Sequence, residues 1–411
     1  MATILAYTSP ALGHLYPMTA LLMELQRRGH HVAVRTLADG VPTALAVGFD
    51  AEPIDSRIER VPMTDWTAPN SRAALKITMG VFAERAQYEI DDARSAIESH
   101  RPDAMIVDAN CWGAASVADA CEIPWAAFWP YTPFLRSRGV PPFGPGLKPL
   151  PGWRGRLRDE MLRPLITGVL ERAMLGSLGA IRREAGARAV GTADGFLRRA
   201  PLMLVATARP FEYLHPDWPD SVQLIGACDF DPGRDGVSGW LNEIERPIVM
   251  VSTSSEAQND DALPIVAMQA LADESIHVVA TFPGGVPDDI TVPANATVAD
   301  FVPHSLILER SVCAITHGGM GVTQKALARG VPVCVVPHGR DQFEVARRVE
   351  VARCGTRLPA RRLTSTRLKH AVLQAMSMTA GARLVADGFR ASGGVARGAD
   401  LIERRLVPSP S

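Results

Sequence analysis

The sequence predicts an α/β fold in which two Rossmann-like domains face a cleft. Three observations carry this prediction. Strand and helix signals alternate along almost the whole chain, which is typical of parallel sheets covered by helices. The alternation runs in two series, and residues 209–235 between them are rich in Pro, Asp and Gly, which suits a linker. The 411 residues also suit two to three domains.

The first series opens with two short apolar runs, residues 3–7 and 31–36, which predict strands. The helix between them is expected to start at Pro17, because a proline at the first helical position loses no hydrogen bond. Residues 104–107 predict a further buried strand that ends at Asp108. These elements together predict the first parallel sheet.

Residues 136–200 interrupt the alternation. Five prolines lie between positions 141 and 151, and a helical stretch follows at about residues 159–185. This pattern predicts an insertion beside the first domain, with exposed apolar residues that could line a pocket. The second series begins after about residue 225. Its predicted strands are residues 248–251, 277–281, 312–316 and 331–336.

The composition excludes several classes of protein. Lys and Arg total 43 against 44 for Asp and Glu, so the chain is unlike a basic nucleic-acid binder. Apolar residues make up 47% and charged residues 21%, which suits a buried core and not a disordered chain. Six scattered cysteines without a C-x-x-C spacing indicate neither a disulfide framework nor a zinc site. Without a long apolar run or a basic leader, we expect a cytoplasmic protein with no stable membrane insertion.

The strongest local signal lies at residues 312–324, where a predicted buried strand runs into a glycine-rich turn and then a helix. Glycines let a ligand approach the backbone closely, and a helix N-terminus offers free N–H groups to an anion. His317 adds a side-chain donor. The pattern fits a diphosphate site, but a tight strand-to-helix turn with a polar cap explains the same residues, since this is neither a P-loop nor a G-x-G-x-x-G motif.

The same stretch carries a resemblance to a known family. Residues 317–321 (HGGMG), followed by 330–332 (GVP) and 341–342 (DQ), resemble the donor-binding signature of nucleotide-sugar-dependent glycosyltransferases. Residues 301–304 (FVPH) resemble the start of that signature, and residues 13–14 (GH) resemble the family's N-terminal base. The resemblance spans nearly the whole chain and is to family 1 of the GT-B fold. This family includes plant secondary-metabolite enzymes and bacterial macrolide and antibiotic enzymes.

The resemblance implies a division of labour between the two domains. An N-terminal acceptor-binding domain would cover residues 1–215, followed by a linker at residues 216–240. A nucleotide-sugar donor-binding domain would cover residues 241–385. A C-terminal helix at residues 386–411 would return toward the first domain.

The resemblance also implies a donor site. The side chain of His317 and the N–H groups around residues 318–322 would bind the diphosphate, Asp341 would hydrogen-bond the donor sugar, and the backbone at Val302 would meet the nucleobase. The alternative for Asp341 is a capping acid at a helix start. The predicted donor-binding residues are Thr253, Ser254, Ser255, Phe301, Val302, His317, Gly318, Gly319, Met320, Gly321, Val322, Thr323, Asp341 and Gln342.

Three positions depart from the family pattern. Lys325 stands where the family often carries a Glu that accepts bonds from both ribose hydroxyls. A lysine only donates, so it cannot replace that acceptor, and it would approach phosphate or face solvent. His304 replaces a frequent Gln, and Val345 replaces a frequent Asn. The choice between UDP and dTDP, and the choice of sugar, therefore stay open.

His14 is the candidate catalytic base. We expect it in the loop after the first strand, and an imidazole with a pKa of about 6.5 accepts a proton near neutrality. Asp108 ends another strand of the same sheet, and an Asp on one imidazole nitrogen fixes the tautomer. The family's His–Asp dyad maps onto this pair. Alternatively, His14 caps a loop and Asp108 caps a helix at residues 113–121.

Aromatic residues follow Asp108 closely, and some of them could face an apolar acceptor. The predicted acceptor-pocket residues are Phe82, Trp112, Trp129, Tyr131 and Phe134.

These patterns together predict an inverting hexosyltransferase. It would move a hexose from a UDP- or dTDP-sugar to a hydroxyl of a bulky apolar natural product or drug, such as a macrolide, ansamycin or phenolic compound. The expected partners are this donor and a small hydrophobic acceptor, without a metal, cofactor or nucleic acid, in a monomer or homodimer. Two alternatives are a GT-B nucleotide-sugar epimerase and a non-catalytic, glycosyltransferase-like auxiliary protein.

Overall fold

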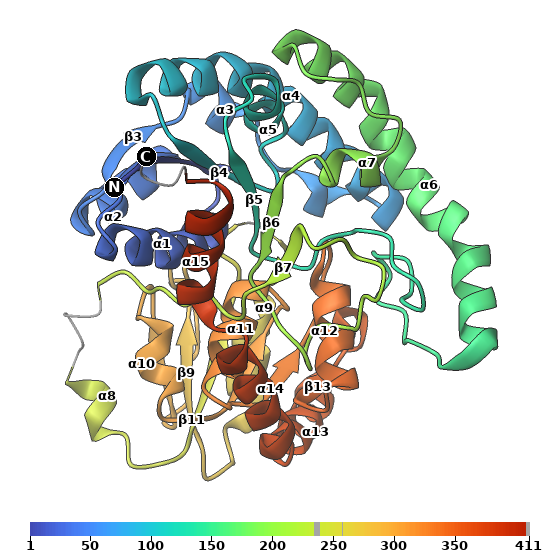
Figure 1. Cartoon of the computed structure of the whole chain (residues 1–411). Coiled ribbons are helices and arrows are strands. Elements are labelled where there is room, and N and C mark those ends of the chain that lie inside the picture. Colours follow the sequence, from blue (N-terminus) through green and yellow to red (C-terminus); the bar gives the residue numbers. More distant parts are fainter. Residues whose placement is uncertain (234–238, 257, 408–411) are drawn as a thin grey trace.

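The computed structural model describes residues 1–233, 239–256 and 258–407. Within these residues the chain forms two α/β domains, one above the other (Figure 1). Each domain is built on an all-parallel sheet covered by helices, so the predicted α/β fold with two Rossmann-like domains is confirmed.

The first domain contains a seven-stranded sheet with the order β3-β2-β1-β4-β5-β6-β7. Leu5 lies opposite Ala33 on one side and Met105 on the other. The central strands are buried apolar runs, as expected where helices cover both faces. The strands are β1 (Thr3–Tyr7), β2 (His31–Thr36), β3 (Asp50–Pro53), β4 (Ala104–Asp108), β5 (Trp125–Trp129), β6 (Leu202–Val205) and β7 (Val222–Leu224).

The second domain contains a six-stranded sheet with the order β10-β9-β8-β11-β12-β13. Met250 lies opposite Val279 on one side and Ala314 on the other. The strands are β8 (Ile248–Ser252), β9 (His277–Thr281), β10 (Ala296–Ala299), β11 (Ser311–Thr316), β12 (Val333–Val335) and β13 (Gly355–Arg357).

Helices connect the strands and cover the sheets (Figure 1). They are α1 (Leu12–Arg27), α2 (Val41–Ala46), α3 (Ser56–Arg60), α4 (Ser71–His100), α5 (Trp112–Ala120), α6 (Gly152–Ala185), α7 (Ala193–Leu197), α8 (Trp240–Glu243), α9 (Ala262–Leu271), α10 (His304–Leu308), α11 (Met320–Ala328), α12 (Gln342–Val351), α13 (Ser365–Met376), α14 (Thr379–Ala391) and α15 (Gly394–Arg405). Short 3-10 turns are η1 (Ala38–Gly40), η2 (Asp65–Thr67) and η4 (Ala360–Arg362).

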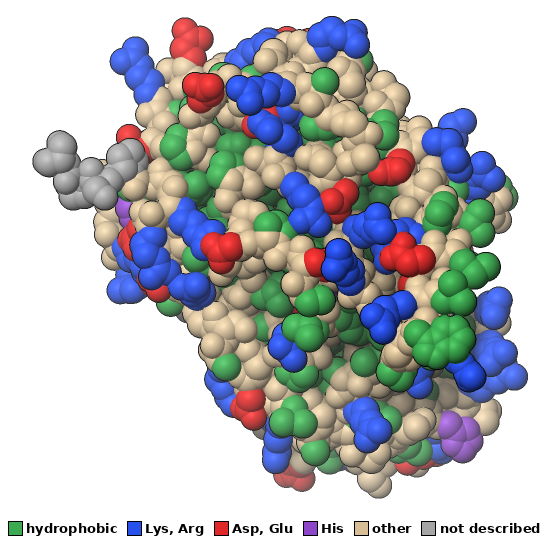
Figure 2. Space-filling model, turned by 45° about the vertical axis from the view of Figure 1, so that its right-hand side comes forward, with side chains coloured by type: hydrophobic (Ala, Val, Ile, Leu, Met, Phe, Trp, Pro, Cys, Tyr) green, Lys and Arg blue, Asp and Glu red, His purple; other side chains and the backbone are tan. Residues whose placement is uncertain are grey.

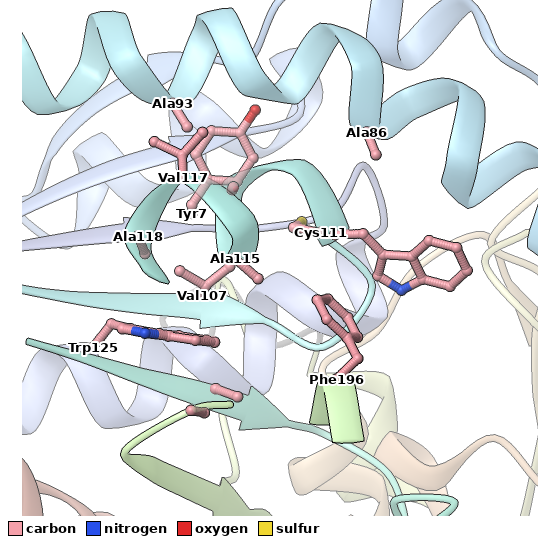
Figure 3. Packing of buried hydrophobic residues seen from close by; sticks show 14 of the residues in the cluster. Tyr7, Ala86, Ala93, Val107, Cys111, Ala115, Val117, Ala118, Trp125 and Phe196 are labelled. Carbon is pink, nitrogen blue, oxygen red and sulfur yellow. The ribbon is translucent and has the colours of Figure 1, made fainter. Parts of the chain in front are cut away.

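Small residues let α4 and α5 pack closely over the first sheet. Figure 3 shows Tyr7 and Val107 of the sheet near Val117 of α5, with Ala86 and Ala93 of α4 above them. These side chains are almost fully buried, and their burial is the main stabilising contribution of such a core. The packing holds the carboxyl ends of β1 and β4 in fixed positions.

The C-terminal helix α15 returns to the first domain and packs on α1 (Figure 1). Leu401 and Ile402 lie in one buried cluster with Leu21 of α1. A Cβ on Gly398 would lie 2.8 Å from Leu21, so the two helices pack in close contact. The start of the predicted C-terminal segment, residue 386, falls inside α14, and residues 408–411 lie outside the described residues.

Several element boundaries differ from the sequence predictions. Helix α1 begins at Leu12 and not at Pro17, because the carbonyl of Ala11 already accepts the N–H groups of His14 and Leu15. His14 therefore lies in the first turn of a helix and not in a loop. The predicted linker 216–240 includes β7, which belongs to the first sheet, and its residues 234–238 lie outside the described residues.

Helix α6 is longer than predicted and begins at Gly152. Within the described residues it is the one helix long and apolar enough to cross a membrane by length and composition. Its buried residues Met174, Leu178 and Ile181 pack in the core of the first domain. Most of the apolar window of α6 is not buried, and one such helix is weak evidence for a membrane span.

Candidate functional site

The predicted site residues gather where the strand order of each sheet reverses. These points lie between β1 and β4 and between β8 and β11. Ligands of open parallel sheets bind beyond the carboxyl ends of the strands at such points. Asp108 ends β4 and His14 follows β1, whereas the turns at residues 253–255 and 317–319 follow β8 and β11. Tyr131, whose ring meets that of His14, packs against the core clusters of both domains, so the two points lie close together.

His14 and Asp108 form a hydrogen-bonded pair. Nδ1 of His14 lies 2.7 Å from Oδ2 of Asp108, and Oδ1 of Asp108 accepts the N–H of Asn110 at 3.0 Å. A carboxylate only accepts, so Nδ1 carries the proton and Nε2 is left as the basic nitrogen. Asp108 does not cap helix α5, whose N-cap residue is Cys111.

The surroundings of His14 act on its pKa in opposite directions. Burial lowers the pKa, but the charge of Asp108 and the hydrogen bond to it raise the pKa more. Glu256 and Asp341 add smaller contributions in the same direction. The net pKa of His14 therefore lies above the ordinary value of 6.5, so the imidazole is a stronger base than a free one.

Two further residues orient the imidazole. The hydroxyl of Tyr131 donates to Oδ1 of Asn110 at 2.7 Å, which turns the amide nitrogen of Asn110 to 3.5 Å from Nε2 of His14. The rings of Tyr131 and His14 meet edge to face, with 5.7 Å between centroids. The sequence reasoning missed Asn110, although its place two residues after Asp108 was an available signal.

The turn after β11 leaves no room for a side chain at two glycines. Gly318 has a φ of 98°, and a Cβ there would lie 2.9 Å from Val335. A Cβ on Gly319 would lie 2.3 Å from Nε2 of His317, so the imidazole rests on the Gly319 backbone. Helix α11 begins directly after this turn. The free N–H groups of a helix N-terminus and an imidazole therefore meet at one place, which suits an anion.

His317 is uncharged at neutral pH. Burial lowers its pKa to about 4, against an opposing contribution from Asp260. Its Nδ1 lies 3.5 Å from the Asp260 carboxylate and has no hydrogen-bond partner among the described residues. His317 can therefore serve an anion as a neutral N–H donor, while the helix N-terminus supplies positive potential.

Asp260 also shapes the turn after β8. Its Oδ2 accepts the N–H of Ser254 at 2.7 Å, and the Ser254 hydroxyl accepts the side-chain amide of Gln258 at 2.8 Å. Thr253 is buried and Ser255 is exposed. One carboxylate thus stands beside both predicted donor turns. The sequence reasoning missed Asp260, because nothing local marks a contact with a histidine 57 positions away.

The side chains of Asp341 and Gln342 have different surroundings, although the two residues are neighbours in the chain. Asp341 precedes α12, but its side chain makes no capping bond, and burial raises its pKa. Gln342 was predicted to bind the donor sugar. Instead, its Oε1 accepts the N–H groups of His338 and Gly339 at 2.7 and 3.1 Å, and its Nε2 donates to Gln258. Both ends of this amide are therefore engaged within the protein.

The side chains at the start of α11 support the turn from beneath. Met320 packs in the core. Thr323, predicted to add a hydroxyl at the diphosphate, is fully buried with its Oγ1 3.4 Å from that of Thr316. Val322 is half-buried, and the Cα of Gly321 faces open space. At residues 320–322 the backbone N–H groups are the predicted contacts that remain, whereas the N–H of Thr323 already bonds to the carbonyl of Gly319 at 3.2 Å.

One of the two predicted places of Lys325 is wrong. Its Nζ pairs with the Asp231 carboxylate and donates to the carbonyl of Phe230 at 2.7 Å, so its charge is engaged within the protein and does not face open solvent. His304 bonds to the Thr281 hydroxyl at 3.2 Å, and burial lowers its pKa to about 4. Val345 lies in the core.

At the predicted nucleobase position, Phe301 is 57% exposed and Val302 is buried. They precede α10 at the carboxyl end of the second sheet. An exposed aromatic ring here leaves a face open to a planar base.

The predicted acceptor aromatics divide into two groups. Trp112 and Trp129 are core residues and do not line an open pocket. Phe82, Tyr131 and Phe134 are half-buried and pack against that core. Phe134 lines a cavity of about 350 Å³ that is also bounded by α6 and α12. A larger cavity of about 590 Å³ lies at the opposite, amino-terminal edge of β8 and β9, away from the site.

One ion-pair cluster joins the two domains beside the site. Arg340 donates to both carboxylate oxygens of Asp65 in η2, at 2.9 and 2.8 Å, and to Glu256 at 2.6 Å. Asp65 is buried, and Arg340 adopts a φ of 51° next to Asp341. The sequence reasoning missed this contact, which spans 275 positions.

No group of three or more His, Cys, Asp or Glu side chains is placed to hold a metal ion in the part of the chain that the structure describes.

The chain is similar to proteins of antibiotic biosynthesis. Residues 266–392 match the family model described as "Erythromycin biosynthesis protein CIII-like, C-terminal domain". The chain is 30% identical to 4'-demethylrebeccamycin synthase of Lentzea aerocolonigenes, over 98% of this chain and 99% of that protein. It is 26% identical to demethyllactenocin mycarosyltransferase of Streptomyces fradiae, over 100% of this chain and 87% of that protein.

Solved structures share the fold. The glycotransferase of kitacinnamycin has a TM-score of 0.74 at 23% identity, covering 98% of this chain and 99% of that one. The glycosyltransferase VinC, solved in complex with dTDP, has a TM-score of 0.69 at 20% identity, covering 98% of this chain and 99% of that one.

Proposed function

The chain belongs to the GT-B family 1 glycosyltransferases of the macrolide and antibiotic type, and from this premise we propose a specific reaction. It is a nucleotide-sugar glycosyltransferase. We propose that it transfers a hexose from a UDP- or dTDP-sugar to a hydroxyl of a bulky apolar natural product or drug, with inversion at the anomeric carbon. The reaction needs neither a metal ion nor a further cofactor.

The pair of His14 and Asp108 is the observation that carries this proposal. Nε2 of His14 removes the proton of the acceptor hydroxyl as its oxygen attacks the anomeric carbon. Asp108, bonded to Nδ1 at 2.7 Å, fixes the tautomer and stabilises the imidazolium that forms. One displacement from the face opposite the diphosphate inverts the configuration. Asn110 holds the ring at its other edge.

The donor half of the reaction rests on the turn after β11. The leaving nucleoside diphosphate gains negative charge as the glycosidic bond breaks. The N-terminal N–H groups of α11 and the neutral His317 stabilise that charge where it develops. Asp341 carries the predicted contact with the sugar hydroxyls. We propose that Gln342 supports this contact indirectly, through the backbone of residues 338–339.

The nucleotide and the acceptor class are also parts of the proposal. VinC, a structural relative solved with dTDP, supports a thymidine diphosphate donor, with a uridine diphosphate donor as the alternative. The half-buried aromatics near His14 and the cavity beside Phe134 support an apolar acceptor.

A donor-by-acceptor matrix tests the reaction. UDP- and dTDP-hexoses are incubated with apolar hydroxylated acceptors, products are weighed by mass spectrometry, and the anomeric configuration is read by NMR. We expect an acceptor that gains one hexose with inverted configuration. Conversion of the sugar nucleotide without any acceptor would instead favour the epimerase alternative. No turnover with any pair would favour the auxiliary protein.

A further inference from the structure

The first half of α6 exposes a line of large apolar side chains. Trp153, Leu157, Met161 and Leu165 are spaced four residues apart and so share one side of the helix. Between 53% and 68% of each side chain is exposed. Leu150, just before the helix, extends the line. We call these five residues the apolar stripe. Figure 2 shows hydrophobic side chains gathered over this part of the molecule, among Lys and Arg side chains.

The other side of the same helix is fixed against the protein. Gly155, Asp159 and Arg163 are buried, and Arg163 lines the 350 Å³ cavity together with Thr167 of the next turn. A Cβ on Gly155 would lie 2.0 Å from the carbonyl of Leu150, so this end of the helix is packed tightly. The apolar stripe therefore points outward and takes no part in closing the cavity. Exposed apolar patches of this kind mark interaction sites.

The charged groups without a partner that flank the stripe are basic, whereas the exposed Glu160 beside Met161 pairs with Arg136 at 3.1 Å. Lys148, Arg154 and Arg156 are exposed, and none of them has an acidic partner in the portion of the chain that the structure describes. The guanidinium of Arg154 lies 5.6 Å from the ring centre of Trp153. Tryptophan beside long cationic side chains is the combination favoured at a membrane–water interface, where the ring lies below the headgroups and the cations reach up to them.

We propose that the apolar stripe docks this protein on the surface of an anionic lipid bilayer. The apolar side chains enter the boundary between headgroups and acyl chains, and Lys148, Arg154 and Arg156 contact lipid phosphates. The helix lies flat, because its charged and buried side remains attached to the first domain. A second copy of the chain fits this surface less well, since a two-fold contact through the stripe brings like charges together.

Docking in this way orients the acceptor side of the molecule toward the bilayer. The cavity beside Phe134 lies on the opposite side of the helix that touches the lipid. An apolar acceptor partitions into bilayers, so the enzyme would collect it from the surface where it is concentrated. This consequence rests on the proposed function, but the docking itself does not.

Vesicle flotation with the full chain, without donor or acceptor, tests the docking. Vesicles contain either phosphatidylcholine alone or equal parts of phosphatidylcholine and phosphatidylglycerol. We expect the protein to float with the anionic vesicles, to float much less with the neutral ones, and to be released by salt. Arg154→Gln with Arg156→Gln should weaken partitioning about 25-fold, at about fivefold for each cation.

Matched variants separate docking from folding. Leu157→Glu with Met161→Glu should abolish flotation, whereas Leu384→Glu, on an exposed apolar residue of α14, should leave it unchanged. Arg361→Gln with Arg362→Gln removes two exposed cations elsewhere and should also have no effect. Each variant is checked for native circular dichroism and for the native midpoint of denaturant unfolding.

The proposal is overturned if the native chain fails to float with anionic vesicles, or if the Leu157/Met161 variant floats as well as the native chain. It is also overturned if light scattering shows a dimer that the same variant converts to a monomer, since a second copy would then cover the stripe. Because no substrate is present, failure here leaves the proposed glycosyl transfer untouched.

Discussion

At the scale of single residues, His14 is held between two opposing influences. Burial disfavours the imidazolium, and the carboxylate of Asp108 favours it more strongly. His14 becomes a buried imidazolium when it takes the proton, so it needs the carboxylate of Asp108 to stabilise that charge. The role of Asp108 can therefore be separated from that of His14 by the pH dependence of the rate.

Replacing Asp108 by Asn should lower kcat/KM by about 10² to 10⁴-fold. It should also move the acidic limb of the pH profile. His14 works in its neutral form, so activity rises as pH rises through its pKa, which lies above 6.5 in the native protein. Without the carboxylate, burial dominates and the pKa falls, so the midpoint moves to lower pH. A midpoint of kcat/KM that stays in place would contradict the pairing.

Lys325 offers a second test at this scale. The carboxylate of its partner Asp231 is almost closed to solvent, so Lys325→Met should lower the free energy of unfolding by about 3 kcal/mol, since that carboxylate loses its counter-charge and keeps the N–H of Ser305 as a donor. Lys325→Met combined with Asp231→Asn should recover most of this loss. Denaturant unfolding measures both variants, with Lys76→Met at an exposed position as the control.

The same double variant tests whether Lys325 contacts the donor. If Lys325 serves only the pair with Asp231, the Kd for UDP and dTDP should equal that of the native chain. Tenfold weaker binding of these nucleotides by the stable double variant would indicate that Lys325 contacts the donor.

The sequence locates a candidate residue best where its place follows from a strand. Asp108 ends β4, His317 follows β11 and His14 lies in the helix after β1, and parallel strands bring their carboxyl ends to one edge. Prediction from the sequence failed where a partner is distant along the chain. Lys325 finds its carboxylate 94 positions away, and no local pattern encodes that contact. The donor roles assigned to individual residues remain predictions.

At the scale of elements, the N-terminus of α11 concentrates the proposed anion chemistry. Gly319 and Gly321 stand two residues apart at this terminus, but their surroundings differ. An added Cβ at Gly319 meets the His317 ring, whereas an added Cβ at Gly321 meets nothing within 4 Å. Alanine variants at these two glycines therefore separate the effect of moving His317 from the general effect of adding a methyl group to the helix start.

Gly319→Ala should displace the His317 ring and weaken binding of UDP and dTDP by about tenfold or more, the loss of one hydrogen bond to a charged group. Gly321→Ala should bind both nucleotides as the native chain does, because alanine suits a helix and has room. Titration calorimetry measures the two variants. Equal affinities in both would place the diphosphate elsewhere.

The residue pattern of each element explains how well the sequence predicts its limits. The strands at residues 3–7, 31–36 and 277–281 match the predicted limits, because each is a short apolar run with an abrupt polar end. The predicted start of helix α1 is wrong because Pro17 is also typical of a first helical position. The helix has already formed its first turn through the N–H groups of His14 and Leu15, and Pro17 lies in its interior.

At the scale of the whole molecule, a buried hub joins the two domains on the acceptor side. Glu212 accepts two hydrogen bonds from Arg348 of α12 at 3.0 and 2.8 Å, and a third from Thr132 at 2.8 Å. Arg348 also pairs with Glu344, whose carboxylate accepts the N–H of Gly144 at 2.9 Å. This hub and the Arg340 cluster fix the relation of the two halves, and neither follows from the sequence alone.

Because of this hub, we expect the free energy of unfolding to decrease at low pH. Burial raises the pKa of Glu212, but Arg348 and His215 outweigh it and lower the pKa to about 2, from 4.5. The carboxylate therefore stabilises the fold above pH 4.5, and about 3 kcal/mol of this is lost as pH falls from 4.5 toward 2.

Glu212→Gln should remove this part of the acid dependence and destabilise the chain at neutral pH. Denaturant unfolding at neutral pH and near about pH 3 measures it, with the exposed Glu98→Gln as control. The assignment fails if Glu212→Gln retains the acid dependence of the native chain.

The central claim is that His14 is the base of a sugar transfer, and a single-turnover measurement tests it most directly. Native chain and His14→Ala are mixed with saturating donor and an acceptor found in the matrix, with the exposed His31→Ala as control. We predict that His14→Ala binds the donor normally but forms glycoside about 10² to 10⁴-fold more slowly, while His31→Ala matches the native rate. Glycoside formation by His14→Ala at the native rate would contradict the account.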